Sequence, residues 1–229
     1  MCGRFTIISN PIAYQLEFDI QVDPGKRIHW DTRYNISPGQ SVPVIKDAQQ
    51  RTLDMMQWGL IPNWATGTKK IIRLINIRSE TIAEKAFTRQ LLQQGKRCLI
   101  LADGFYEWQV ADRKNSLKAP FYFHLKGHKP FAFAGIWNAC RTSESHLIET
   151  CAILTCVPND LVSRVHDRMP VILNRETGMQ WLTPNPFAEL IALLTPYPAN
   201  EMVSYPVNPR VNNPALDSEE CLLPAEGDR

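Results

Sequence analysis

A cysteine at position 2, directly after Met1, is the residue of this sequence with the most distinctive chemistry. A side chain this small normally permits removal of Met1, which would leave Cys2 with a free α-amine beside its thiol. Together the two groups convert an aldehyde into a thiazolidine ring, because the amine forms an imine that the thiol then closes. The amine is reactive at neutral pH, since an α-amino pKa lies near ~7.8 against ~10.4 for lysine. The alternative is a cysteine that merely occupies a frayed terminus.

Polar and apolar side chains alternate in residues 74–80. In an extended strand this alternation puts Asn76, Arg78 and Glu80 on one face, while the isoleucines between them point into the core. An amide, a guanidinium and a carboxylate in a row favour the polar wall of a pocket. A solvent-facing strand edge is the alternative.

Glu107 stands between Tyr106 and Trp108, shortly after an apolar run that ends at Gly104. Aromatic neighbours remove water from a carboxyl group and raise its pKa, which suits general acid–base chemistry. The alternative is a glutamate at the rim of the fold that pairs with an arginine.

His166 precedes Asp167 and Arg168 at the start of another apolar run. A histidine in this setting can donate or shuttle a proton near pH 7. A purely structural histidine is the alternative.

Two tryptophans, Trp58 and Trp64, precede a basic segment. Residues 61–97 carry eight Lys or Arg side chains against two acidic ones. Exposed indoles beside cations stack on unpaired bases, at about 1–3 kcal/mol per base. A core position is the alternative, more so for Trp58, and a solvated helix surface is the alternative for the basic segment. The turn over residues 34–39 could lie against such a site.

The elements that must position these residues are predicted from periodicity and turn signals. Helices are predicted over residues 12–18, 79–94, 176–182 and 186–194, the second with a Thr81–Glu84 capping box and a stop at Gly95. Strands are predicted over residues 42–45, 53–58, 71–77, 97–102, 121–125, 131–136, 150–156 and 171–173, with residues 126–130 joining two of them in a hairpin. The pattern predicts one α+β domain over residues 1–229, built on a curved, mostly antiparallel β-sheet or barrel with short peripheral helices. A proline-rich, irregular C-terminal tail is expected over residues 195–229.

Composition excludes several classes of protein. The net charge of +2 shows no overall basicity, and 44% apolar residues suffice for a substantial core. The sequence shows no secretory leader and no apolar run near the ~20 residues of a membrane span. We therefore expect a cytoplasmic protein, nucleoid-associated when bound to DNA, whose six cysteines are reduced. Cys98, Cys151 and Cys156 are predicted core residues. The sequence contains no residue spacing that predicts a metal site or a cofactor-binding site.

Six segments together resemble the SRAP family, the SOS-response-associated peptidases or YedK-like abasic-site proteins. They are residues 1–5, 34–39, 58–62, 76–81, 102–108 and 166–171, which read MCGRF, YNISPG, WGLIP, NIRSET, ADGFYEW and HDRMPV. The resemblance implies that Cys2 crosslinks to abasic sites in single-stranded DNA, and that Asn76, Glu107 and His166 surround it in the active site.

The resemblance also implies the contacts to DNA. Arg4, Arg78 and Arg168 would contact phosphates, while Pro38 and Trp64 would pack against flanking bases. Some bacterial members carry paired tryptophans after the glycine-containing turn, whereas here Asn63 precedes a single Trp64.

Two other functions are open at this point. An N-terminal cysteine near Asn, Glu and His also resembles an amide hydrolase with an N-terminal nucleophile, for which removal of Met1 would be autocatalytic. A DNA-binding module that uses the basic face without chemistry is the third possibility. The expected partner is single-stranded DNA with abasic sites, bound by a monomer, without a membrane or a metal.

Overall fold

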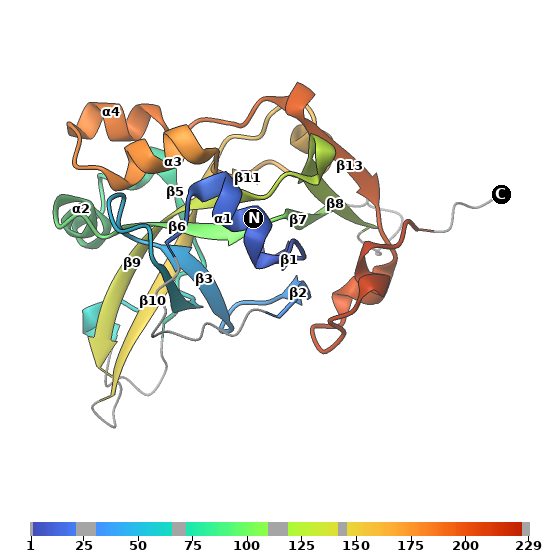
Figure 1. Ribbon diagram of the computed structural model, residues 1–229, viewed down its shortest axis with the longest axis horizontal. Helices are drawn as coiled ribbons and strands as arrows, with labels where there is room; N and C mark the ends of the chain where they lie inside the picture. The colour runs from blue at the N-terminus through green and yellow to red at the C-terminus, as the bar shows by residue number, and fades with distance from the viewer. Residues whose placement is uncertain (1, 22–30, 66–71, 110–118, 142–145, 226–229) are drawn as a thin grey trace.

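Five strands form a closed barrel in the computed structural model, which describes residues 2–21, 31–65, 72–109, 119–141 and 146–225 (Figure 1). Around the ring, each strand pairs with the next, and β10 pairs with β9 to close it. All of these pairings are antiparallel except the parallel pair β4–β10. In ring order the strands are β3 (Ser41–Ile45), β4 (Leu53–Trp58), β10 (Leu147–Cys156), β9 (Phe131–Arg141) and β6 (Arg97–Ala102).

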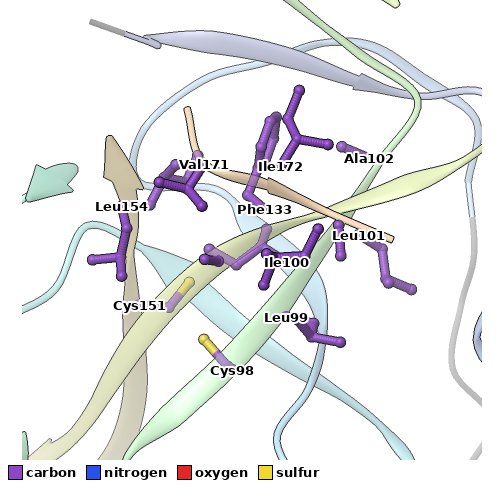
Figure 2. Close-up of a cluster of buried hydrophobic side chains, with 14 of the residues drawn as sticks. Cys98, Leu99, Ile100, Leu101, Ala102, Phe133, Cys151, Leu154, Val171 and Ile172 are labelled. Carbon is purple, nitrogen blue, oxygen red and sulfur yellow. The ribbon is translucent and has the colours of Figure 1, made fainter. Parts of the chain in front are cut away.

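Apolar side chains fill this barrel (Figure 2). Every residue of β6 is buried, as expected of a strand that is covered on both faces. Cys98 from β6 and Cys151 from β10 point toward each other in the core, and both are fully buried (Figure 2). Cys156 is also buried, which confirms that these three cysteines serve as small apolar residues.

A second, antiparallel sheet carries the N-terminal segment. Its strand order is β13 (Met202–Pro206), β8 (Ala119–Leu125), β7 (Gly104–Gln109), β1 (Arg4–Ile7) and β2 (Arg33–Ile36). Only Asp103 separates β7 from the barrel strand β6. Gly104 is required here, because a Cβ atom at this position would lie 2.2 Å from the hydroxyl of Tyr122. This tight junction holds β1 and β7 against the barrel.

The helices and three short strands surround the barrel. Helix α2 packs on β9, α3 packs on β6 and β9, and α4 follows α3 on the outside (Figure 1). The helices are α1 (Pro11–Phe18), α2 (Ala86–Gln93), α3 (Arg175–Leu182) and α4 (Phe187–Ala192), and the remaining strands are β5 (Asn76–Arg78), β11 (Met169–Pro170) and β12 (Ile172–Leu173).

The predicted α+β class with a largely antiparallel barrel is confirmed. The helix predicted over residues 79–94 is wrong in its first half, because α2 begins only at Ala86. Residues 79–81 form a 3₁₀ turn instead, and Ser79 is buried where this turn packs against β10. The Thr88 hydroxyl donates to the carbonyls of Ile82 and Lys85 ahead of the helix. Tertiary packing therefore overrides the local capping signal.

Three other predictions need correction. Of the strand predicted over residues 71–77, only residues 76 and 77 belong to a strand, where β5 begins. Position 71 lies outside the described residues. The hairpin over residues 126–130 is wrong, because β8 and β9 belong to different sheets and residues 126–128 form a 3₁₀ turn with Gly127 at φ 69°. The C-terminal tail is not irregular throughout, since β13 pairs with β8 as an edge strand.

Candidate active site around Cys2

Cys2 lies at the start of the N-terminal strand, beside β7. Arg4 of β1 pairs with Tyr106 of β7, so the residues just before Arg4 run past Glu107. The Cys2 side chain is fully buried, and its thiol donates to the carbonyl of Arg4 with an S···O distance of 3.7 Å. Burial, and secondarily the nearby carboxyl of Glu107, raise the pKa of the Cys2 thiol. The thiol is therefore protonated at neutral pH and needs a proton acceptor in order to react.

Asn76 holds the backbone of Cys2 through a hydrogen bond. Strand β5 pairs in parallel with β10, which places Asn76 beside Ile153. The Asn76 Nδ2 atom donates to the Cys2 carbonyl oxygen at 2.8 Å. Its Oδ1 atom is buried and, within the part of the chain that the structure describes, accepts no hydrogen bond. This oxygen is suited to accept an N–H or O–H from a bound group.

Glu107 is a buried carboxyl group in the middle of β7. Only 2% of its surface is exposed. Burial is the main cause that raises the pKa of Glu107 from 4.5 to about 7. The direction of this shift is the one expected from the sequence, but Tyr106 and Trp108 point to the opposite face of β7, because successive side chains of a strand alternate between its faces. At neutral pH this carboxyl group is divided between its protonated and ionised forms, as acid–base catalysis requires.

His166 faces Glu107 from a short turn before β11. Its Nε2 atom lies 3.8 Å from Oε2 of Glu107. The backbone N–H of Arg168 donates to Nδ1 of His166 at 3.0 Å, and a carboxylate oxygen of the exposed Asp167 also lies 3.0 Å from Nδ1. The Arg168 N–H favours the neutral tautomer that carries its proton on Nε2, toward Glu107, whereas the Asp167 carboxylate favours a proton on Nδ1.

The four predicted catalytic residues therefore lie in one region: Asn76 binds the Cys2 carbonyl, Glu107 is near enough to the Cys2 thiol to raise its pKa, and His166 faces Glu107. A nucleophile lies near a buried carboxyl group whose pKa is about 7, an imidazole faces this carboxyl group, and one amide fixes the backbone of the nucleophile. This combination is suited to covalent chemistry at Cys2. No group of three or more His, Cys, Asp or Glu side chains that could hold a metal occurs in the described ranges.

Two of the predicted phosphate contacts have their guanidinium groups engaged within the protein. The Arg4 Nη1 atom donates to Asn35 Oδ1 at 2.7 Å and to the carbonyl of Val211 at 3.0 Å. Arg168 binds Glu80 through two hydrogen bonds of 2.6 and 2.8 Å. The bonds of Arg4 explain how the C-terminal tail is tied to β1 and β2.

The other predicted DNA contacts lie on the surface. Trp64 is 63% exposed, and Pro38 and Arg78 are exposed as well. Trp58, in contrast, is fully buried and donates from its indole to the carbonyl of Ile75, as its alternative assignment to the core predicted.

The basic segment is not one continuous cationic face. Arg97 is buried, and its guanidinium donates to backbone carbonyls at the ends of α2 and α3. Lys96 lies over the ring of Trp137, with its Nζ atom 5.5 Å from the ring centroid. Two further lysines, at positions 69 and 70, lie outside the described residues. The exposed arginines of this segment are Arg73, Arg78 and Arg89.

The family model described as SOS response associated peptidase (SRAP) matches residues 1–214. The chain belongs to the SRAP family. The abasic site processing protein YoqW of Bacillus subtilis (strain 168) is 40% identical over 227 residues, which cover 97% of this chain and 99% of that protein. The abasic site processing protein HMCES of Xenopus tropicalis is 33% identical over 220 residues, which cover 82% of this SRAP chain and 65% of that protein.

Solved structures show the same SRAP fold. A crystal structure of a protein from Bacteroides thetaiotaomicron superposes with a TM-score of 0.84 at 25% identity, covering 98% of this chain and all of the other (100%). A phage-related protein from Bordetella bronchiseptica superposes with a TM-score of 0.69 at 30% identity, covering 90% of this chain and 94% of the other. In the described part of this SRAP chain, no helix is both long and apolar enough to cross a membrane.

Two polar residues that were not among the predicted site residues, Asn138 and Thr150, support the turn that precedes Trp64. Asn138 of β9 is fully buried and donates from its side chain to the Ile61 carbonyl at 2.9 Å and to Asn63 Oδ1 at 2.7 Å. The Thr150 hydroxyl accepts from the backbone N–H of Ile61 at 3.1 Å. The same rule that singled out Asn76, a polar residue inside an apolar run, would have found Asn138.

Proposed function

We propose that this SRAP protein recognises abasic sites in single-stranded DNA and forms a covalent crosslink with them through Cys2 after removal of Met1. The observation that carries the proposal is that Asn76 binds the Cys2 carbonyl while the pairing of β1 with β7 brings Cys2 near the buried Glu107. The relatives named abasic site processing proteins support the assignment of the DNA lesion. The crosslink would shield the lesion during the response to DNA damage.

The proposed reaction starts from the ring-opened aldehyde of the abasic sugar. The Cys2 amine adds to C1′, and the loss of one water gives an imine. The thiol then adds across the C=N bond, so that an S–C1′ bond forms and the thiol proton ends on the nitrogen. The product is a thiazolidine, and water is its only leaving group.

Each neighbouring residue has a role in this scheme. His166 would donate a proton to the ring oxygen of the sugar when the ring opens. Glu107 would accept a proton from the amine and return it to the departing hydroxyl group. Because the Cys2 thiol is protonated, Glu107 is also the nearby base that could carry its proton to nitrogen. Asn76 would hold the terminal amine or the sugar by hydrogen bonds.

The proposed DNA path runs over the exposed residues near this site. Trp64 and Pro38 would pack against bases that flank the lesion, and Arg78 would contact phosphate. A duplex would keep C1′ away from the buried Cys2, which favours a single strand. The imine also acidifies the 2′ hydrogens, so slow strand cleavage by β-elimination is an expected side activity.

Denaturing gel electrophoresis of the protein with a labelled single strand that bears one abasic site tests the proposal. We expect a heat-resistant adduct, absent with Cys2→Ala, whose intact mass equals protein plus DNA minus one water. Cys2→Ser should form the imine but not a stable thiazolidine. A wild-type protein that lacks Met1 and forms no adduct would refute the proposed function.

Removal of Met1 is the only peptide-bond cleavage that this scheme requires, and an autopeptidase activity would be limited to it. A Cys2→Ala precursor, purified and incubated alone, separates the two routes. Retention of Met1 in this variant, with loss from the matched Cys2 precursor, would show self-processing. Loss from neither precursor would assign the step to a separate aminopeptidase.

A further inference from the structure

A bidentate ion pair fixes the segment that follows His166. Nη1 of Arg168 lies 2.6 Å from Oε1 of Glu80, and Nη2 lies 2.8 Å from Oε2. Nη2 also donates to the carbonyl of Thr155 at 2.7 Å. The side chain of Arg168 is 10% exposed and that of Glu80 is 44% exposed. This two-point geometry orients the arginine far more closely than a single surface contact would.

The same residue, Arg168, holds the imidazole of His166. Its backbone N–H donates to Nδ1 of His166 at 3.0 Å, which directs Nε2 toward Glu107. Arg168 thus has two roles. Its side chain anchors this segment to Glu80, and its backbone N–H orients the imidazole ring of His166.

Glu80 belongs to the turn that directly follows β5, the strand that carries Asn76. The Glu80–Arg168 pair therefore links the segment that holds the Cys2 carbonyl to the segment that holds His166. Arg168 is also the main cause that lowers the pKa of Glu80, so the pair is ionised at neutral pH.

We propose that Glu80 is a positioning residue for the crosslinking reaction, which acts through Arg168 on the orientation of His166. The inference rests on the proposed function.

The opposite role for Glu80 makes a different prediction. If Arg168 must leave Glu80 in order to bind phosphate, then Glu80 competes with DNA. Removal of its charge would then tighten DNA binding and leave the chemical step unchanged. A positioning residue has the reverse effect, because misplacement of a reacting group slows the chemical step without weakening binding.

The test measures two quantities with a single strand that bears one abasic site: the rate constant of adduct formation at saturating DNA and the DNA concentration that gives half of this rate. Glu80→Gln keeps the shape of the side chain but removes its charge. We expect the rate constant to fall about tenfold, while the half-saturating concentration stays within twofold. Glu84→Gln, an exposed glutamate with the same change in charge, is the matched control and should behave as wild type.

Arg168→Lys provides a second variant, since lysine keeps the charge but cannot bind Glu80 through two parallel bonds. The same fall is expected, and the double variant should be no slower than either single variant. A lower half-saturating DNA concentration together with an unchanged rate constant in Glu80→Gln would overturn the inference. Additive losses in the double variant would also overturn it. An absence of adduct with the wild-type protein would instead refute the proposed function itself.

Discussion

The Nε2 atom of His166 lies 3.8 Å from the Oε2 atom of Glu107, on the buried side of β7. The imidazole is partly exposed, with 20% of its side chain accessible, whereas the carboxyl group is not. A proton could therefore pass between solvent and the buried carboxyl through the ring. This relationship explains how a site that hides its nucleophile can still exchange protons with water.

The first prediction concerns pH and the rate of adduct formation. Because burial raises the pKa of Glu107 to about 7, its ionised form increases as the pH rises through this value. We expect the rate constant at saturating DNA to increase between pH 6 and pH 8. In Glu107→Gln the rate should be lower and should follow only the α-amine, whose pKa lies near ~7.8. An identical pH profile in both proteins would contradict a base role for Glu107.

The same raised pKa has a consequence for stability. A carboxyl group with a folded pKa above its unfolded value stabilises the fold below the unfolded pKa and loses this contribution as the pH rises through the folded pKa. For Glu107 the window runs from 4.5 to about 7. Glu107→Gln should therefore gain stability relative to wild type between pH 5 and pH 8, measured by urea unfolding. A constant difference between the two proteins would contradict the burial of an ionisable Glu107.

A third prediction concerns Asn35, which anchors the C-terminal tail. Its side chain is fully buried, accepts from Arg4, and donates to three tail carbonyls, those of Val211, Asn213 and Leu216. Asn35→Ala leaves these groups without their partner, and we expect a loss of about 2–3 kcal/mol in the free energy of unfolding.

Asn185→Ala is the control for this loss. Asn185 makes one exposed hydrogen bond, from its side chain to the Gln180 carbonyl, so its replacement should cost less than about 1 kcal/mol. Equal losses in urea unfolding of the two variants would show that the tail is not anchored through Asn35.

Particular residues show what the sequence could and could not reveal. The sequence reveals Asn76 and Glu107 because each is a polar residue inside an apolar or aromatic run. Such a residue needs a hydrogen-bonding partner when the run is buried. The inward direction of Arg4 could not be found, since its partner Val211 is far along the chain and contributes only a carbonyl. In the same way, the strand β13 forms in a proline-rich tail because β8 offers it a free edge, which no local pattern encodes.

A fourth prediction concerns the support of Trp64. Because Asn138 fixes the turn before Trp64, Asn138→Ala should release this turn and weaken binding to a single strand. Stacking on one indole contributes about 1–3 kcal/mol, so Trp64→Ala should weaken binding by about 5- to 150-fold. Fluorescence anisotropy with an undamaged labelled strand measures both. If Asn138 acts through Trp64, the effect of Asn138→Ala should largely vanish in the Trp64→Ala background, whereas independent losses would contradict this support.

The last prediction separates the exposed arginines of the basic segment. Arg78 pairs with Thr155, the residue whose carbonyl also binds Arg168, so Arg78 lies beside the site. Arg89 lies on α2, which packs against β9. Each phosphate contact to a single strand adds about 0.7 to the slope of log K against log salt concentration. We therefore expect Arg78→Ala to reduce this slope by about 0.7 and Arg89→Ala to leave it unchanged, in anisotropy titrations from ~50 to ~200 mM salt. Equal reductions would place the DNA along the whole basic segment, and a reduction only in Arg89→Ala would move the phosphate path to α2.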